Sequence, residues 1–331
     1  MKKIIAIVYL VLVGATFHAQ DFHLSQFDAA EIRMNPAMAG RDYKEGNDYR
    51  ISNIYRTQWS AVSSKPFTTI YLAYDTRYKK KWGFGGHLMN NQAGNMSFRT
   101  FSLDLCASYN IINDPKNEHT LVVGLQMGMM NKSFKSQMVF DSQYSSSTGG
   151  FDPSADNGES FLRRSIVRFD AGVGLYYRYR PTGKKYSPYG GISLGHISFP
   201  DQSFYGGWEA VPMIMRISAG SDFKIKESFE INPVFLMMYQ RKAQEYFLNV
   251  NGRYKLKNEN YDIRFLMGYR LKDAFVFGAG MRYKEIVAKV SYDINTSYLS
   301  NYTHGRGGFE ISLAYQGFYR SEKFKTFIGK F

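Results

Sequence analysis

Between Ser165 and Tyr179 the chain alternates apolar and polar residues with a period of two. The apolar positions of this run are Val167, Phe169, Ala171, Val173, Leu175, Tyr177 and Tyr179. The residues between them are mostly charged, small or amphipathic, so the alternation predicts a β-strand with one apolar and one polar face. The run is longer than the usual strand of about five or six residues. It suits the strands of roughly 9–11 residues that cross a membrane in a β-barrel.

The same alternation recurs along most of the chain, clearly at 101–111 and 261–270. Counting these runs predicts fourteen strands, at 48–58, 66–77, 81–90, 96–112, 119–131, 164–180, 187–198, 211–224, 228–241, 244–257, 259–271, 273–283, 285–295 and 307–319. An even number of strands is typical of single-chain bacterial barrels. The fold class predicted is therefore all-β, a closed antiparallel transmembrane β-barrel over 48–319.

The connections between the predicted strands support this fold. Short connections rich in Asn, Asp, Pro, Gly and Lys alternate with longer ones, of which the longest are 131–163, 199–210 and 296–306. Membrane barrels have short periplasmic turns and longer external loops. The alternative is a β-rich secreted protein, in which no such asymmetry is expected.

The N-terminus has the features of an export signal. Lys2 and Lys3 precede an apolar run from Ile4 to Phe17, and Ala19 provides a small residue for cleavage. The run is too short for a membrane-spanning helix, so we expect residues 1–19 to be a Sec signal peptide that directs the chain to the cell outer membrane. The alternative is a retained anchor helix.

Residues 20–47 have no period-two pattern. We expect a short helix from Ser25 to about Met34, ended by Asn35-Pro36, because proline disfavours helix at the residue before it. The segment is predicted to plug the barrel or to lie across its periplasmic mouth. Its apolar anchors would be Phe22, Phe27, Ile32 and Met34. Residues 320–331 form a short basic tail.

Charge and composition limit the kinds of partner that this protein is expected to bind. The chain has 42 basic and 28 acidic residues, a net charge of +14, spread along the strands rather than clustered. An exported chain does not ordinarily meet nucleic acid, so we expect a basic lumen and contacts with anionic outer-membrane lipid. The single cysteine, Cys106, excludes an intramolecular disulfide and falls on the polar face of its strand.

Patterns that could carry enzymatic chemistry have structural explanations. Gly191–Gly195 matches G-x-S-x-G, but that motif needs a strand-to-helix turn and here lies within a predicted strand. His196 is three residues from Ser193, which places the two on opposite faces of a strand. The acidic loop at 141–159 makes calcium conceivable but lacks the EF-hand spacing. We therefore predict no catalytic, metal or cofactor-binding residues, and no cofactor.

Aromatic residues in the predicted external loops are candidates for partner binding. They are Tyr144, Phe151, Trp208 and Tyr302. Tyrosine and tryptophan are favoured anchors of protein interfaces. The alternative is that these residues form the upper aromatic girdle or pack the loops together.

Short motifs at both ends of the chain are more specific. They read QDFHLSQF at 20–27, MNPAMAG at 34–40, YRTQW at 55–59, SYDINTS at 291–297 and GRGGFEISL at 305–313. In this order and spacing the chain resembles the PorP/SprF family of the type IX secretion system. The resemblance implies an outer-membrane barrel that works with secretion machinery subunits. It also implies a role in exporting or retaining a secreted adhesin or other cargo protein, in some members for gliding motility, and it implies no catalytic residues.

Two alternatives to this function remain at the level of sequence. Fourteen strands enclose a usable lumen, so a diffusion or uptake channel is the second hypothesis. An outer-membrane hydrolase is the third, and the motifs give it little support.

Overall fold

The computed structural model describes residues 21–41, 47–61, 65–79, 81–94, 98–112, 114–116, 118–134, 143–145, 147, 149–152, 155, 162–258, 260–298 and 300–319. The expected signal peptide and the C-terminal tail lie outside these residues. Among the residues described, no helix is long and apolar enough to cross a membrane.

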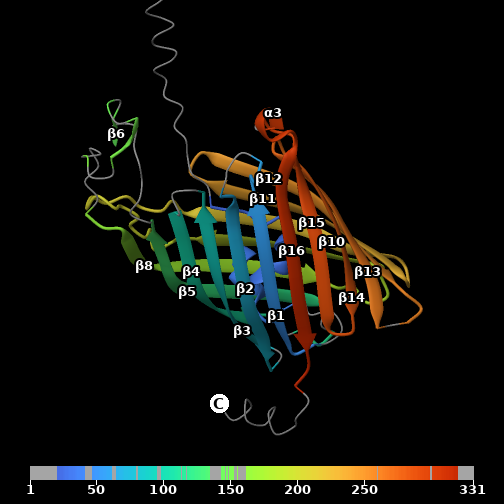
Figure 1. Ribbon diagram of the computed structural model, residues 1–331. Helices are drawn as coiled ribbons and strands as arrows, with labels where there is room; N and C mark the ends of the chain where they lie inside the picture. The colour runs from blue at the N-terminus through green and yellow to red at the C-terminus, as the bar shows by residue number, and fades with distance from the viewer. Residues whose placement is uncertain are drawn as a thin grey trace, which may run out of the picture.

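Fourteen antiparallel strands close into one barrel (Figure 1). In chain order they are β1 (Tyr49–Gln58), β2 (Phe67–Tyr78), β3 (Trp82–Ala93), β4 (Phe98–Asn110), β5 (His119–Ser133), β8 (Ser165–Tyr179), β9 (Tyr186–Gly195), β10 (Ile214–Lys226), β11 (Phe229–Gln240), β12 (Ala243–Lys255), β13 (Tyr261–Arg270), β14 (Ala274–Tyr283), β15 (Ile286–Asn295) and β16 (Arg306–Gly317). The predicted fold is confirmed, with each strand at its predicted place to within a few residues. The main shift is the connection between β9 and β10, which spans 196–213 rather than 199–210.

The barrel closes by pairing its first strand with its last. β1 and β16 are paired from Tyr49↔Gly317 to Gln58↔Gly308. An unpaired strand edge exposes backbone N–H and C=O groups that hydrocarbon cannot satisfy, so this seam is required of a barrel that spans a membrane.

The two ends of the barrel differ. The strands β2 and β3, β10 and β11, and β14 and β15 are joined by short turns at one end, here called the short-turn mouth, where β1 begins and β16 ends. The longer connections lie at the other end, the long-loop mouth. It carries the small hairpin of β6 (Tyr144–Ser145) and β7 (Gly150–Phe151) and the helix α3 (Ser300–Thr303), both at the top of Figure 1.

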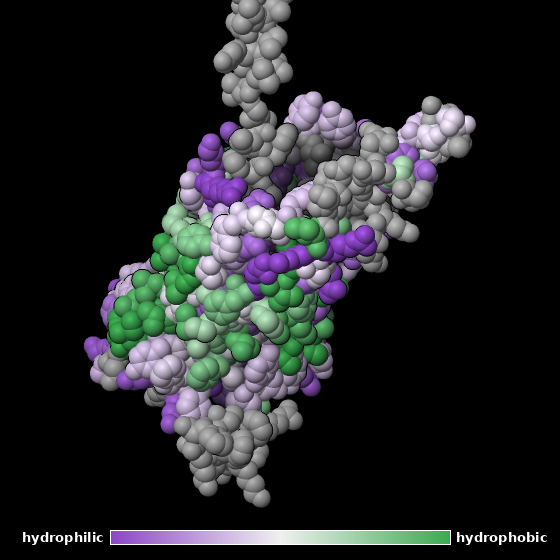
Figure 2. Space-filling view, turned by 90° about the vertical axis from the view of Figure 1, so that its left-hand side faces the viewer, coloured by the Kyte–Doolittle hydropathy of each residue, from purple (hydrophilic) through white to green (hydrophobic). Residues whose placement is uncertain are grey.

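The outer surface is apolar. Side chains on alternate strand positions point outward and are exposed, for example Leu105, Val167, Phe169 and Leu248. Figure 2 shows such side chains gathered over the middle of one face, with polar ones mainly toward its ends. Aromatic pairs near the short-turn mouth, such as Trp82 with Tyr109, form part of a girdle.

The N-terminal segment 21–41 lies inside the barrel. It consists of η1 (Phe27–Ala29), α2 (Glu31–Met34) and η2 (Pro36–Met38). The single helix expected from Ser25 to Met34 is wrong, since Ser25 bonds to the barrel wall instead of capping a helix. Asp21 contacts residues at the long-loop mouth and Asn47 contacts Gln316 at the short-turn mouth, so the chain runs along the lumen.

Candidate functional site

A buried cluster of charged groups holds the N-terminal segment at the barrel seam. We call it the seam clamp; its members are Ser25, Gln26, Arg56, Asp293 and Glu310. The carboxylate of Glu310 accepts the backbone N–H groups of Ser25 at 2.9 Å and of Gln26 at 2.8 Å. Arg56 pairs with Glu310 at 3.0 Å and with Asp293 at 2.8 Å. The seam clamp thus joins β1, β15 and β16 to the N-terminal segment.

The side chains of Ser25 and Gln26 complete the seam clamp. The Ser25 hydroxyl donates to Asp293, while Gln26 donates to Ser291 at 3.0 Å and accepts from Ser312 at 2.6 Å. Both residues are fully buried. The bond from Ser25 to Asp293 is charge-assisted, and such bonds are about twice as strong as neutral ones.

Another part of the barrel wall, on β3, β5, β8 and β9, contacts the N-terminal segment at glycine residues. We call Gly83, Gly124, Gly174 and Gly191 the glycine shelf. A Cβ at Gly124 would lie 2.1 Å from the backbone nitrogen of Ala37, and one at Gly174 would lie 2.0 Å from the Asn35 side-chain oxygen. Only glycine therefore lets the Asn35-Pro36-Ala37 backbone approach this closely.

Asn35 fixes the segment to the glycine shelf. Its amide nitrogen donates to the carbonyl of Leu175 on β8 at 2.9 Å, and its side-chain oxygen accepts the Ala37 backbone N–H at 3.0 Å. Nearby, the Ser193 hydroxyl donates to the Met34 carbonyl at 2.6 Å. This contact assigns the serine of the G-x-S-x-G pattern to holding the segment.

Ion pairs bind the segment to other parts of the wall. Arg50 on β1 contacts Glu31 at 2.6 Å, and Lys289 on β15 contacts Asp28 at 2.6 Å. The basic side chains of both pairs are largely buried, and partly buried pairs are less screened by salt than surface pairs.

The start of the segment is anchored at the long-loop mouth. His196, just after β9, contacts Asp170 at 2.7 Å and Asp21 at 3.0 Å. Burial alone lowers the pKa of His196, but the charge of Asp21 and the hydrogen bonds with Asp170 and Asp21 outweigh it and raise the pKa to about 9. Burial would raise the pKa of Asp21, yet the charge of His196 holds it well below its usual range. The histidine is therefore charged at neutral pH.

The four anchors expected from sequence have different surroundings. Phe27 packs edge-on against Phe247 at 5.6 Å between ring centroids, within an apolar cluster that Met34 also touches. Ile32 is buried in a second cluster, and Phe22 is partly buried against it. Cys106 lies in this second cluster too, on the lumen side.

The segment divides the lumen into two main cavities. The loop chamber, of about 480 Å³, lies at the long-loop mouth and is lined by residues such as Phe22, Arg33 and His196. The vestibule, of about 1030 Å³, lies at the short-turn mouth. The two share no lining residue among those described. A smaller space of about 220 Å³ beside Phe27 and Met34 adjoins the vestibule at Asp222 and Glu230.

Basic side chains line the lumen, and several of them are paired with carboxylates. Arg270 contacts Asp293 at 2.6 Å, and Arg253 and Arg282 both contact Asp262. The alternation of apolar and polar residues in the sequence predicts that these charged side chains face the lumen. It could not predict that Arg56 and Glu310 contact Ser25 and Gln26, because that contact joins distant parts of the chain.

The aromatic residues predicted to bind a partner lie at the long-loop mouth in separate elements. Tyr144 and Phe151 face each other across the β6–β7 hairpin, with ring centroids 5.3 Å apart. Tyr302 stacks edge-on with Tyr298 at 5.9 Å. Trp208 is 75% exposed and, among the residues described, has no ring contact with either pair. The predicted partner-binding residues therefore lie in three separate exposed places at this mouth.

Comparisons with known proteins place the chain in a family. The model of the type IX secretion system membrane protein family PorP/SprF matches residues 16–315. A comparison with curated protein sequences gives no match. The matched region contains nearly the whole barrel and the N-terminal segment.

Solved structures are similar in fold. The CymD monoaromatic hydrocarbon channel is 11% identical with a TM-score of 0.53, covering 88% of this chain and 94% of that one. The Ralstonia pickettii toluene transporter TbuX is 10% identical with a TM-score of 0.54, with the same coverage. A deletion mutant of the TodX monoaromatic hydrocarbon channel is 11% identical with a TM-score of 0.56. Identities this low show the barrel architecture alone, whereas the family match covers most of the sequence. The chain belongs to the PorP/SprF family of type IX secretion system membrane proteins.

Proposed function

We propose that this protein docks or anchors a secreted surface protein at its long-loop mouth and supports that protein's export. It does so as a non-enzymatic outer-membrane barrel of the type IX secretion system. Its partners would be subunits of the secretion machinery, the cargo and outer-membrane lipid. In a gliding cell the cargo would be an adhesin. Family membership supports the setting, and the features of the long-loop mouth support the docking role.

The orientation follows from the connections. Short turns of membrane barrels face the periplasm and long loops face outward. The long-loop mouth would then be external, and the exposed side chains of Tyr144, Phe151, Trp208 and Tyr302 would meet cargo that has crossed the membrane.

The observation that carries the proposal is the occupied lumen. Segment 21–41 is held by the seam clamp and the glycine shelf, and it separates the loop chamber from the vestibule. A diffusion channel, which the names of the structural neighbours suggest, would require this segment to leave. A docking protein can keep it in place.

The test replaces Tyr144, Phe151 and Trp208 by alanine together. We expect the barrel to assemble and the co-encoded secreted proteins to be released into the medium. The matched control replaces Trp82, Tyr254 and Tyr283, exposed aromatic residues at the short-turn mouth. Quantitative immunoblotting of cells and medium gives the retained fraction. Unchanged retention of every candidate cargo in the first variant contradicts docking by these residues.

A further inference from the structure

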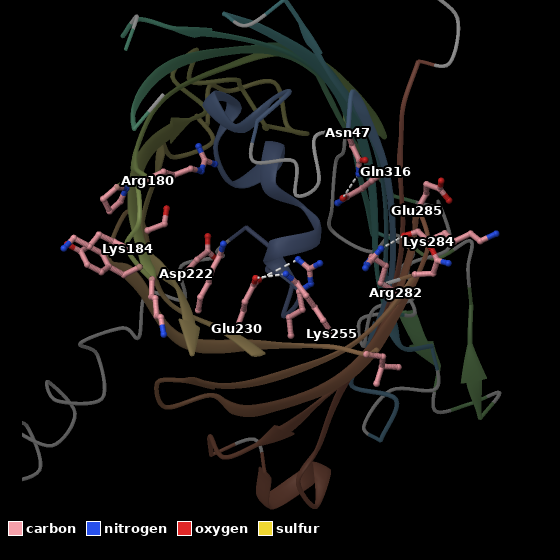
Figure 3. A pocket seen from close by; sticks show the side chains of 18 of the residues that line it. Asn47, Arg180, Lys184, Asp222, Glu230, Lys255, Arg282, Lys284, Glu285 and Gln316 are labelled. Atoms are coloured by element: carbon pink, nitrogen blue, oxygen red, sulfur yellow. Dashed lines mark hydrogen bonds and ion pairs between the residues drawn. The ribbon is translucent and has the colours of Figure 1, made fainter. Parts of the chain in front are cut away.

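The vestibule is a large, open, polar cavity at the short-turn mouth. Its volume, about 1030 Å³, is at the upper end of the roughly 300–1,000 Å³ usual for ligand pockets. Figure 3 shows its walls formed by side chains from several strands and turns, with part of the N-terminal segment behind them. A ligand entering from this mouth therefore meets the segment and does not reach the loop chamber.

The vestibule is strongly basic. Its lining includes eight basic residues: Arg180, Lys184, Lys185, Lys224, Arg253, Lys255, Arg282 and Lys284. It includes only three acidic residues: Asp222, Glu230 and Glu285. Basic side chains thus exceed acidic ones by five. The loop chamber, by contrast, is lined by three carboxylates, Asp21, Asp104 and Asp170, and by three Lys or Arg residues, besides two histidines.

Two of the three acidic residues of the vestibule already form ion pairs with basic residues of the protein. Asp222 is paired with Arg178 and accepts a hydrogen bond from Asn232 at 2.8 Å. Glu230 contacts Lys255 at 3.1 Å and Arg253 at 3.7 Å. These internal pairs leave part of the positive charge uncompensated.

Four lysines carry the uncompensated charge. Lys184, Lys185, Lys224 and Lys284 have no carboxylate within 4 Å among the residues described. All four are exposed to solvent. Lys224 follows Asp222 by two positions on β10 and so shares its lumen-facing side. A concave surface with one sign of charge and apolar walls behind it concentrates ions of the opposite sign.

Some basic residues at this mouth lie where lipid headgroups would be. Figure 3 shows Lys184 and Lys284 at the rim, while Arg180, Lys255 and Arg282 lie on the inner side of the wall. An anionic bilayer accounts for the rim residues but does not reach the inner ones. Lys255 and Arg282 are already paired with Glu230 and Asp262. Lys224, on the lumen-facing side of β10, adds inner charge that a ligand entering the lumen would neutralise.

We propose that the vestibule binds an acidic segment of a periplasmic protein, an extended peptide with several Asp or Glu side chains. A single small anion would fill a minor part of the cavity, whereas an extended peptide presents carboxylates at intervals that several strands can contact. The site lies at the mouth opposite the proposed cargo-docking residues. Failure of either proposal therefore leaves the other standing.

The test measures binding of a fluorescein-labelled oligoglutamate peptide to the purified full-length protein in detergent by fluorescence anisotropy. An oligoglutamine peptide of equal length is the uncharged probe. We expect saturable binding of oligoglutamate only, weakened as NaCl is raised from about 50 mM to about 500 mM. Absence of saturable binding at the lower salt concentration overturns the proposal.

Two double variants locate the site. Lys185→Gln with Lys224→Gln is expected to weaken binding by about tenfold, since it removes two uncompensated charges. Lys242→Gln with Lys272→Gln removes the same charge from exposed turns at the long-loop mouth and is expected to leave the affinity unchanged. Equal affinities of the two double variants overturn the proposal.

Nanodiscs separate a lipid site from a peptide site. If Lys185→Gln with Lys224→Gln lowers retention of phosphatidylglycerol by the protein but leaves oligoglutamate binding intact, these lysines serve the bilayer and the proposal is wrong. We expect the reverse result, with peptide affinity lowered and lipid retention unchanged.

Discussion

The two walls of the lumen hold the same N-terminal segment by different physical means. At the seam, the buried carboxylate of Glu310 takes two backbone N–H groups and the guanidinium of Arg56. At the glycine shelf, Gly124 and Gly174 contribute no side chain at all. The backbone of Pro36 and Ala37 fills the space at Gly124, and the Asn35 side chain fills it at Gly174.

The difference shows how each wall can fail. Removing one partner of the seam clamp leaves a buried charge or N–H group without that hydrogen-bonding partner. The loss lowers the free energy of unfolding, because the group remains buried away from water. The glycine shelf would be disrupted by adding a side chain. Even one methyl group would collide with the N-terminal segment, which the seam clamp holds in place. A segment held in both ways has little freedom to shift within the barrel.

The largest effect is expected from Glu310→Ala. The change leaves the N–H groups of Ser25 and Gln26 without their acceptor and removes one of the two carboxylates that pair with Arg56. We therefore expect a loss of about 3–5 kcal/mol in the free energy of unfolding. Urea titration of the detergent-solubilised barrel, followed by heat-modifiable gel mobility, measures it. Glu285→Ala, at the half-buried rim of the vestibule, is the control, and an equal loss there would contradict the seam clamp.

The next effect tests which face of β8 points inward. Val173 is exposed on the outside of the strand that carries Gly174, so Val173→Arg should cost about 2–4 kcal/mol near the bilayer midplane. Ser218→Arg places the same charge in the lumen, beside the space of about 220 Å³, and should be tolerated better. Refolding yield into liposomes reports both. If the two arginines are tolerated equally, the glycine shelf does not face the lumen.

A smaller effect is expected at the glycine shelf. Gly124→Ala inserts a methyl group 2.1 Å from the Ala37 nitrogen and should cost about 1–3 kcal/mol. In Gly207→Ala the nearest atom, the Ser203 hydroxyl oxygen, lies 4.0 Å away, so this control should change stability little. Hydrogen exchange of residues 34–39 should increase in the first variant only; increases of the same size in both would contradict close packing at Gly124.

The smallest effect is pH-dependent loosening at the long-loop mouth. The pKa of His196 is raised to about 9, so its contribution is complete below its ordinary value and is lost as pH rises through about 9. We expect hydrogen exchange of residues 21–24, corrected for the intrinsic rate, to increase between neutral pH and pH about 10. His196→Gln should remove this dependence, and a persistent dependence in that variant would assign it to another group.

The barrel could be predicted from the sequence because each strand and turn is encoded by residues that are close together along the chain. Alternation along 165–179 fixes which side chains face lipid, and turn residues fix where strands end. Placement of Glu310 and Ser312 on the inner face also follows from a period of two.

The contacts of the N-terminal segment could not be predicted in the same way. Ser25 meets Glu310 across 285 residues of chain, and no local pattern encodes such a pairing. The helix expected from Ser25 to Met34 failed for the same reason, because bonds to the wall compete with helix capping. In the sequence, Gly124 and Gly174 do not differ from other glycines within strands. Their role is visible only from the close contact with the N-terminal segment.

Conductance in planar lipid bilayers tests the central claim, that the N-terminal segment closes the lumen, most directly. The purified full-length protein is predicted to insert and remain electrically silent. Glu310→Ala, which releases the seam clamp, is predicted to show intermittent openings. Steady conductance of the unmodified protein, at a level expected for an open barrel of this size, would contradict the claim and favour the channel function.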